Sequence, residues 1–259
     1  MNRLDKLFQK KNKSVLAIYA TAGFPNVNDT CKTIVELDRA GADIVEIGMP
    51  FSDPLADGST IQASSLRAIE NGMTLKLLFE QLKDIRKETD IPLVLMGYLN
   101  PVMVFGAEAF CQKCREVGVD GLILPDMPMW EFENFYRPLF QKYGLYAIFL
   151  VTPQTSDERV KLLDAASGGF LYAVSVSTTT GKSGRFDATQ EAYFKRLSEL
   201  KLKNPVLVGF GISDAVNFNI TNKYLNGGVV GSAFIRALEK GEEINDFVKM
   251  IRGENVLTN

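Results

Sequence analysis

A glutamate interrupts an otherwise apolar, β-type run at residues 43–49. By the two-residue alternation of a strand, Glu46 shares a face with Ile44 and Gly48. If that face points into a core, desolvation raises the pKa of the carboxyl. A glutamate whose pKa is raised to roughly 6–7 can both take and return a proton. The alternative is a structural carboxylate that is paired with a lysine or arginine of a neighbouring strand.

A second carboxylate, Asp57, lies in the segment that follows this run. Ser59 and, three residues later, Gln62 predict a helix that begins with a capping box, and Gly72 is expected to end it. Asp57 would then be a loop residue at the end of a strand. It is either a second catalytic carboxylate or an ordinary turn-forming aspartate before a glycine.

The chain contains no histidine, which excludes Ser–His–Asp and Cys–His nucleophile schemes. Proton transfer near neutral pH must therefore use carboxylates, tyrosine, lysine or cysteine. The chain has three cysteines, Cys31, Cys111 and Cys114. Pairing two of them would leave one thiol free, which argues against a disulfide framework. The C-x-x-C pair lies in a helical pattern, and without histidine or a second such pair no metal site is expected.

Two glycine-containing turns follow the last two apolar runs. Gly209, Phe210 and Gly211 end one run, and Gly231 and Ser232 end the next, just before a short helical pattern. Glycines let backbone N–H groups approach an anion closely, and a helix N-terminus adds an oriented dipole. The pair of turns predicts a phosphate site, with tight connecting turns as the alternative.

The elements that must position these residues alternate between apolar runs and amphipathic stretches. The runs are residues 15–21, 43–49, 92–98, 121–125, 146–152, 170–175, 205–209 and 228–231. The helical patterns are residues 28–40, 74–88, 107–117, 131–143, 156–166, 188–200 and 215–224. Nearly continuous apolar runs are typical of strands buried on both faces, and the alternation indicates parallel βαβ units.

Eight such units in 259 residues favour a closed (β/α)₈ TIM barrel over an open sheet. No linker divides the chain, so we expect a single domain over residues 1–259. In a TIM barrel the active site lies at the C-terminal ends of the strands, which is where both carboxylates and both glycine turns are expected. Apolar residues near the same ends could line a ligand pocket, with plain core packing as the alternative for each. They are Tyr19, Met96, Tyr98, Ile123, Phe210 and Val229.

The composition of 46% hydrophobic and 23% charged residues, with a net charge of −2, is that of an ordinary globular protein. There is no basic excess to neutralise a nucleic-acid backbone, so no nucleic-acid partner is expected. The chain has neither a signal-peptide pattern at its start nor an apolar run of membrane-spanning length. We therefore expect a cytoplasmic protein with no membrane association.

The run VEIGMPFSDPLADGSTIQ at residues 45–62 closely resembles the signature of tryptophan synthase alpha chains. The likeness continues in order along the chain through LMGYLNPV, GVDGLILPDMP, GFGIS and GSAFI. It implies a TIM-barrel lyase that cleaves indole-3-glycerol phosphate to indole and glyceraldehyde 3-phosphate. In that family the strand glutamate and the aspartate of the ADG turn are catalytic, and here they correspond to Glu46 and Asp57.

The resemblance also implies roles for other residues. Tyr172 matches a tyrosine close to the reacting centre, and the phosphate of the substrate is expected at the glycine turns, on Gly211, Gly231 and Ser232. Thr180 and Gly181 match a loop that closes over the substrate. This loop departs from the family in having Thr178 where a further glycine is common. The difference bears on how the loop closes over the substrate and not on the reaction that is expected.

Neither a metal nor an organic cofactor is implied for this chain, since the pyridoxal phosphate of the complete enzyme belongs to the beta subunit. The family assembles as an αββα heterotetramer. Asp53 matches a position that faces the beta subunit, and residues 99–102 are expected on the same side.

Three alternatives remain open at the level of sequence. Another phosphate-binding barrel, such as a histidine-pathway isomerase or a prenyl-glyceryl phosphate synthase, would explain the glycine turns but not the PFSDPLADG stretch. A purely regulatory partner of a beta subunit would not need intact Glu46 and Asp57. A free-standing indole-releasing lyase would resemble the alpha chain in all these features.

Overall fold

Short parallel strands form one continuous sheet that closes on itself. The computed structural model describes residues 1–54, 57–175 and 185–254. Within these residues the strands are β1 (Val15–Thr21), β2 (Ile44–Gly48), β3 (Leu93–Met96), β4 (Gly121–Ile123), β5 (Tyr146–Ala147), β6 (Leu150–Val151), β7 (Leu171–Val174), β8 (Val206–Gly209) and β9 (Gly227–Val230). Their order in the sheet is β5-β4-β3-β2-β1-β9-β8-β7-β6.

The two strands at the ends of this order, β5 and β6, come from one stretch of chain. Ile148 N donates to Leu122 O at 2.9 Å, on the side of β4, while Tyr172 N donates to Phe149 O at 3.0 Å, on the side of β7. The run predicted as a single strand therefore pairs with β4 through its first half and with β7 through its second half. The ladder closes into the predicted (β/α)₈ barrel.

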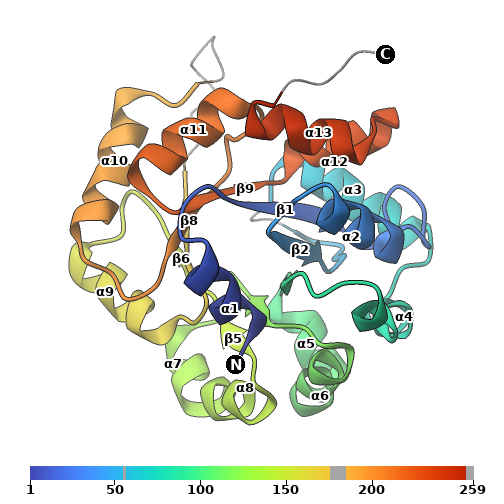
Figure 1. Cartoon of the computed structure of the whole chain (residues 1–259). Coiled ribbons are helices and arrows are strands. Elements are labelled where there is room, and N and C mark those ends of the chain that lie inside the picture. Colours follow the sequence, from blue (N-terminus) through green and yellow to red (C-terminus); the bar gives the residue numbers. More distant parts are fainter. Residues whose placement is uncertain (55–56, 176–184, 255–259) are drawn as a thin grey trace.

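Helices surround the strands on the outside (Figure 1). They are α1 (Arg3–Lys10), α2 (Thr30–Arg39), α3 (Ser59–Glu70), α4 (Leu75–Leu82), α5 (Leu99–Phe105), α6 (Ala107–Val117), α7 (Met129–Glu131), α8 (Arg137–Tyr143), α9 (Asp157–Ala166), α10 (Ala188–Glu199), α11 (Ala215–Tyr224), α12 (Ser232–Lys240) and α13 (Ile244–Arg252), with short non-α turns η1 (Ile85–Lys87) and η2 (Phe132–Tyr136). The predicted boundaries hold to the residue for α6 and α11. The sequence patterns do not predict α1, α5 or α13.

Alternation along each strand divides the core into two layers. In β1, Tyr19 faces the barrel interior and Ile18 faces the surrounding helices, and both are buried. The interior layer also receives Leu4 of α1, which is fully buried and contributes roughly 2 kcal/mol by that burial. In Figure 1, α1 crosses in front of the strands and covers one end of the barrel.

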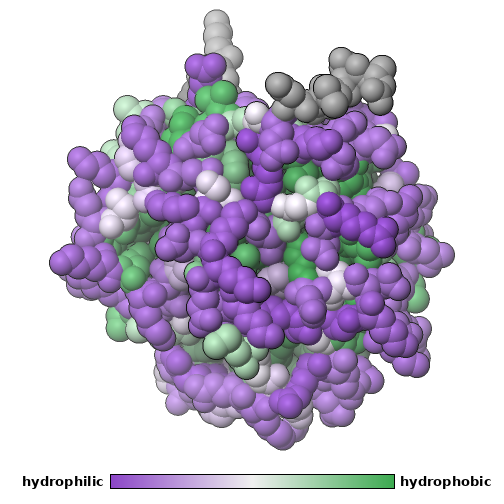
Figure 2. All heavy atoms as spheres, viewed as in Figure 1, coloured by the Kyte–Doolittle hydropathy of each residue, from purple (hydrophilic) through white to green (hydrophobic). Residues whose placement is uncertain are grey.

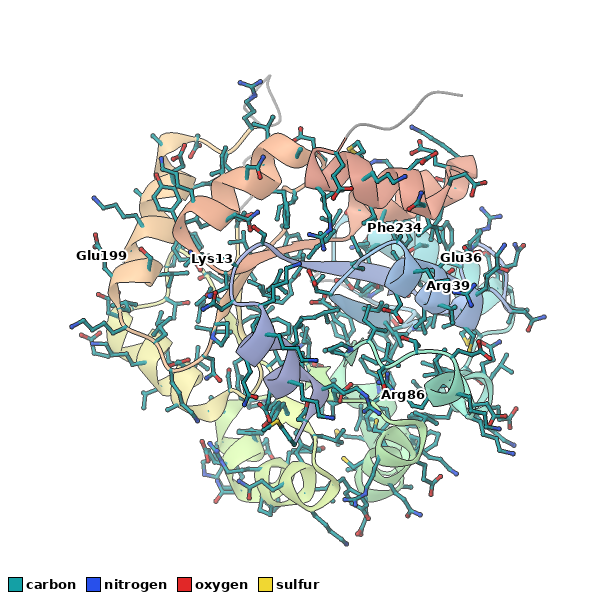
Figure 3. The ribbon with its side chains drawn as sticks, in the orientation of Figure 1. Lys13, Glu36, Arg39, Arg86, Glu199 and Phe234 are labelled. Atoms are coloured by element: carbon teal, nitrogen blue, oxygen red, sulfur yellow. The ribbon has the colours of Figure 1, made fainter. Side chains whose placement is uncertain are left out.

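Polar contacts tie together the N-terminal ends of the strands, away from the expected site. Arg86 Nη2 donates to Gly118 O at 2.6 Å and to Asp120 Oδ2 at 3.0 Å, and the same carboxylate oxygen accepts from Leu93 N at 3.0 Å (Figure 3). These bonds fix the starts of β3 and β4. The face seen in Figure 2 is mainly hydrophilic, with small separate hydrophobic areas. In the described part of the chain no helix is both long enough and apolar enough to cross a bilayer.

Candidate active site

Glu46 lies in the middle of β2 with its side chain inside the barrel. Its backbone is in register with Tyr19 of β1 and Val94 of β3, and the residue is 0% exposed. Within the described residues neither carboxylate oxygen has a hydrogen-bond partner. Burial raises the pKa of Glu46 to about 8. The alternative of a structural ion pair is therefore contradicted for the described part of the chain, and Glu46 is protonated at neutral pH.

Two phenols surround this carboxyl group, and two glycines make room for them. A Cβ added to Gly48 would lie 2.0 Å from Tyr19 Oη, and one added to Gly209 would lie 2.1 Å from the Tyr172 ring. Burial, and then the nearby carboxylates, raise the pKa of both Tyr19 and Tyr172 far above the ordinary value. Both phenols therefore stay neutral, and the Glu46 carboxyl is enclosed by neutral groups on these sides.

Asp57 occupies the loop between β2 and α3 and is half-buried. Its backbone N–H donates to Pro54 O at 3.0 Å, and Tyr98 Oη donates to its Oδ2 at 3.2 Å. Burial raises the pKa of Asp57, and the hydrogen bond from Tyr98 opposes that rise. A small pocket joins this carboxylate to the barrel interior. It is lined by Tyr19, Met49, Pro54, Asp57, Ser65, Met96, Gly97, Tyr98 and Pro125.

The capping box predicted at Ser59 and Gln62 is wrong. Gly58 is the N-cap of α3, Ser59 is already the first helical residue, and the cap makes no side-chain hydrogen bond. The Gln62 amide instead donates to the backbone oxygen of Asp57 at 2.8 Å and to that of Pro54 at 3.3 Å. Gln62 therefore braces the loop that carries Asp57. The helix ends before Gly72, which has a φ of +92°, as predicted.

The predicted pocket residues converge at the interior and upper end of the barrel. The interior cluster contains Tyr19, Met96, Ile123, Tyr172 and Val229, with Phe210 packed against it. Tyr98 is the N-cap of α5 and lies beside Asp57.

Sequence reasoning missed Phe51, whose ring stacks on that of Tyr98 with centroids 5.0 Å apart. Its place in the PFSDP motif was the available signal.

The glycine turns after β8 and β9 lie side by side, because Gly209 is in register with Val229. Gly211 has a φ of +77°, and a Cβ there would lie 2.9 Å from Phe186, so its own conformation requires glycine. A Cβ at Gly231 would make only ordinary contacts, at 3.5 Å or more, and φ there is −115°. Gly231 is also the N-cap of α12, and the lack of a side chain leaves the first N–H groups of the helix, including that of Ser232, open to close approach by an anion.

Three other expectations concern the rim of the site. Thr180 and Gly181 lie outside the described residues. Asp53 is exposed in the loop before Asp57, as a docking residue must be. Residues 99–102 form the start of α5, and Val102 is fully buried, so it cannot contact a partner.

The two thiols of the C-x-x-C pair are unreactive. Cys111 and Cys114 are buried in α6, and burial raises the pKa of both thiols. In the described ranges no cluster of three or more histidine, cysteine, aspartate or glutamate side chains could hold a metal ion. The buried Glu46 and the half-buried Asp57 are carboxyl groups that can transfer or accept protons.

Comparison with known proteins extends this picture. The model of the tryptophan synthase alpha chain family matches residues 6–256. The tryptophan synthase alpha chain of Flavobacterium johnsoniae is 52% identical over 254 residues, covering 97% of this chain and 100% of its own length. Tryptophan synthase subunit alpha from Legionella pneumophila is 32% identical and superposes with a TM-score of 0.86 over 98% of both chains.

A chain of tryptophan synthase from M. tuberculosis in its aminoacrylate-bound form is 27% identical, with a TM-score of 0.85 over 98% of this chain and 100% of that one. The match to the family model covers nearly the whole chain, and the identity to the F. johnsoniae relative extends over its full length. The chain therefore belongs to the tryptophan synthase alpha chain family.

Proposed function

We propose that Glu46 and Asp57 carry out the reaction of this family, the retro-aldol cleavage of indole-3-glycerol phosphate to indole and glyceraldehyde 3-phosphate. The observation that supports the proposal most directly is the state of Glu46. It is a fully buried carboxyl group with a pKa of about 8 and, among the described residues, no partner that would explain its burial structurally. Such a group can deliver a proton at neutral pH and take one back.

The bond between indole C3 and the glycerol side chain breaks only when the ring can accept the electrons of that bond. Protonated Glu46 gives its proton to C3, and Asp57 accepts the hydrogen bond of the ring N–H, which becomes more acidic as positive charge develops there. The Glu46 carboxylate then removes the proton of the adjacent glycerol hydroxyl. The C–C bond breaks, the aldehyde forms, the electrons return to the ring, and Glu46 ends protonated as it began.

The rest of the site supports binding of the same substrate. The apolar interior around Ile123 and Val229 suits a flat indole, and the turns at Gly211 and Gly231 suit its phosphate. Asp57 is half-buried and therefore accessible to the ring N–H, whereas Glu46 lies deeper, at the level of Tyr19 in the barrel.

The alpha chains of this family work with a beta subunit, which carries the pyridoxal phosphate of the assembly, and they need no cofactor of their own. The αββα heterotetramer is the corresponding assembly for this chain. We infer a cytoplasmic enzyme of tryptophan biosynthesis, because that is where this family acts.

The test is to incubate the purified chain with indole-3-glycerol phosphate, alone and with a tryptophan synthase beta subunit. Glyceraldehyde 3-phosphate is followed by a coupled dehydrogenase and indole by chromatography. Equal amounts of both products are expected, faster with the beta subunit. Absence of both products under both conditions would refute the proposed function.

A further inference from the structure

The hydrogen bond between Tyr98 and Asp57 has a geometry that the binding of indole alone does not explain. Tyr98 Oη lies 3.2 Å from Asp57 Oδ2, and in the described part of the chain it is the only side-chain donor to that carboxylate. A carboxylate has two oxygens that can accept. With Oδ2 engaged by the phenol, and no donor to Oδ1 among the described residues, Oδ1 can accept the N–H of a ligand.

One ring stacks on that of Tyr98, and the backbone that follows Tyr98 is fixed by a hydrogen bond. It stacks on Phe51 with centroids 5.0 Å apart and an interplanar angle of 29°. Phe51 is itself anchored, since its N–H donates to Ser65 Oγ at 2.9 Å. In the residue that follows Tyr98, Leu99 N at the start of α5 donates to Asp126 Oδ1 at 2.9 Å.

These contacts connect three loops of the catalytic face at Tyr98 and its neighbour Leu99. Phe51 and Asp57 belong to the loop after β2, Tyr98 to the end of β3, and Asp126 to the loop after β4. A tyrosine that was only a wall of the indole pocket would need its ring, not a hydroxyl aimed at the carboxylate. We propose that Tyr98 is a positioning residue, which orients the Asp57 carboxylate for the indole N–H and holds it ionised.

This inference rests on the proposed function for its catalytic consequence, but the bond itself can be tested without substrate. Burial raises the pKa of Asp57 and the Tyr98 hydrogen bond opposes that rise. Among the described residues, the other titratable groups that interact with this carboxylate are the neutral phenols of Tyr19 from β1 and Tyr172 from β7, whose pKa the charge of Asp57 raises. Removing the Tyr98 hydroxyl therefore moves the pKa of Asp57 upward, so the ionised form appears only at higher pH.

The experiment uses Tyr98→Phe, which keeps the stacked ring and removes the one hydroxyl. The pKa of Asp57 is measured by carboxyl ¹³C NMR in the free chain, with Asp57→Asn to assign the signal. The kcat and KM values for indole-3-glycerol phosphate are measured across pH. We expect a higher pKa of Asp57, a shift of the acid limb of kcat to higher pH, and a fall in kcat of roughly 10-fold with little change in KM.

Tyr143→Phe is the matched control, because Tyr143 Oη donates to Glu108 Oε1 at the same 3.2 Å on the outer surface. This variant should leave the pKa of Asp57 and both kinetic constants unchanged. A second variant, Phe51→Leu, removes the stack and keeps the hydroxyl, and it should raise the pKa of Asp57 by less than Tyr98→Phe does.

An unchanged pKa of Asp57 in Tyr98→Phe, or a change in KM alone, would overturn the proposal. So would an unaltered pKa of Asp57 in Phe51→Leu. If the wild-type chain does not cleave the substrate, the proposed function fails, and the NMR titration still decides whether Tyr98 controls Asp57. Thermal unfolding of each variant establishes that it is folded before these readouts are compared.

Discussion

Replacing Glu46 by glutamine should abolish catalysis and at the same time stabilise the fold. Glutamine keeps the shape of the side chain and cannot transfer a proton. Since general acid–base catalysis contributes roughly 10²–10⁴-fold, turnover of indole-3-glycerol phosphate should fall by at least that order while the substrate still binds. In the wild type, activity should also fall as the pH rises above about 8, where Glu46 loses the proton that it must donate.

The effect on stability follows from the same burial. The pKa of Glu46 rises from 4.5 to about 8 on folding, so above pH 4.5 the unfolded chain releases a proton that the folded chain retains. Stability is therefore fully present below pH 4.5 and is lost, at about 1.4 kcal/mol per pH unit, as the pH rises toward 8. The loss amounts to roughly 3 kcal/mol at pH 7 and about 5 kcal/mol at most. Glu46→Gln carries no such charge and should escape this loss.

The assay is urea unfolding of both proteins at pH 5, 7 and 8.5, alongside steady-state kinetics. The stability advantage of Glu46→Gln should be small at pH 5 and should grow with pH. Glu199→Gln is the matched control, because Glu199 lies on the outer surface with 66% of its side chain exposed (Figure 3). It should change neither turnover nor the pH dependence of stability. Near-native turnover of Glu46→Gln, or a stability difference that does not vary with pH, would refute the reasoning.

Four further variants, at three positions, test the remaining parts of the site. Asp57→Asn should lower turnover strongly and Asp57→Ala more so, because asparagine still places an oxygen near the indole N–H; equal kcat for all three proteins would remove Asp57 from the mechanism. Gly211→Val should raise KM and weaken inhibition by glycerol phosphate, since φ is +77° there and a Cβ meets Phe186 at 2.9 Å; unchanged inhibition in a folded variant would place the phosphate elsewhere. Asp53→Ala, at an exposed position, should reduce the activation of the lyase by a beta subunit more than it reduces basal cleavage; undiminished activation would exclude Asp53 from docking.

The order of strands and helices could be predicted from the sequence because it depends on local patterns of apolar and polar residues. Apolar runs that alternate with amphipathic helices indicate parallel βαβ units, whatever the details of packing. The bounds of α6 follow from Gly106 and Gly118, and the start of α11 follows from Asp214. The helices α1 and α13 are short, and the side-chain cap of Asn2 on α1 and the left-handed Gly253 after α13 do not secure such short helices by themselves. Their stability comes from tertiary burial, as with Leu4, which is fully buried in the barrel.

At the site, the sequence by itself determined which residues can do the chemistry. The absence of histidine leaves carboxylates, tyrosine, lysine or cysteine for proton transfer, and Glu46 is the carboxylate set within an apolar strand. Only the tertiary structure decided what state that carboxylate is in. Its pKa depends on side chains from other strands, and the closed barrel surrounds it with neutral phenols and, within the described residues, no cation. The contact of Tyr98 with Asp57 likewise joins residues 41 positions apart, which meet only because β2 and β3 are neighbours in the barrel.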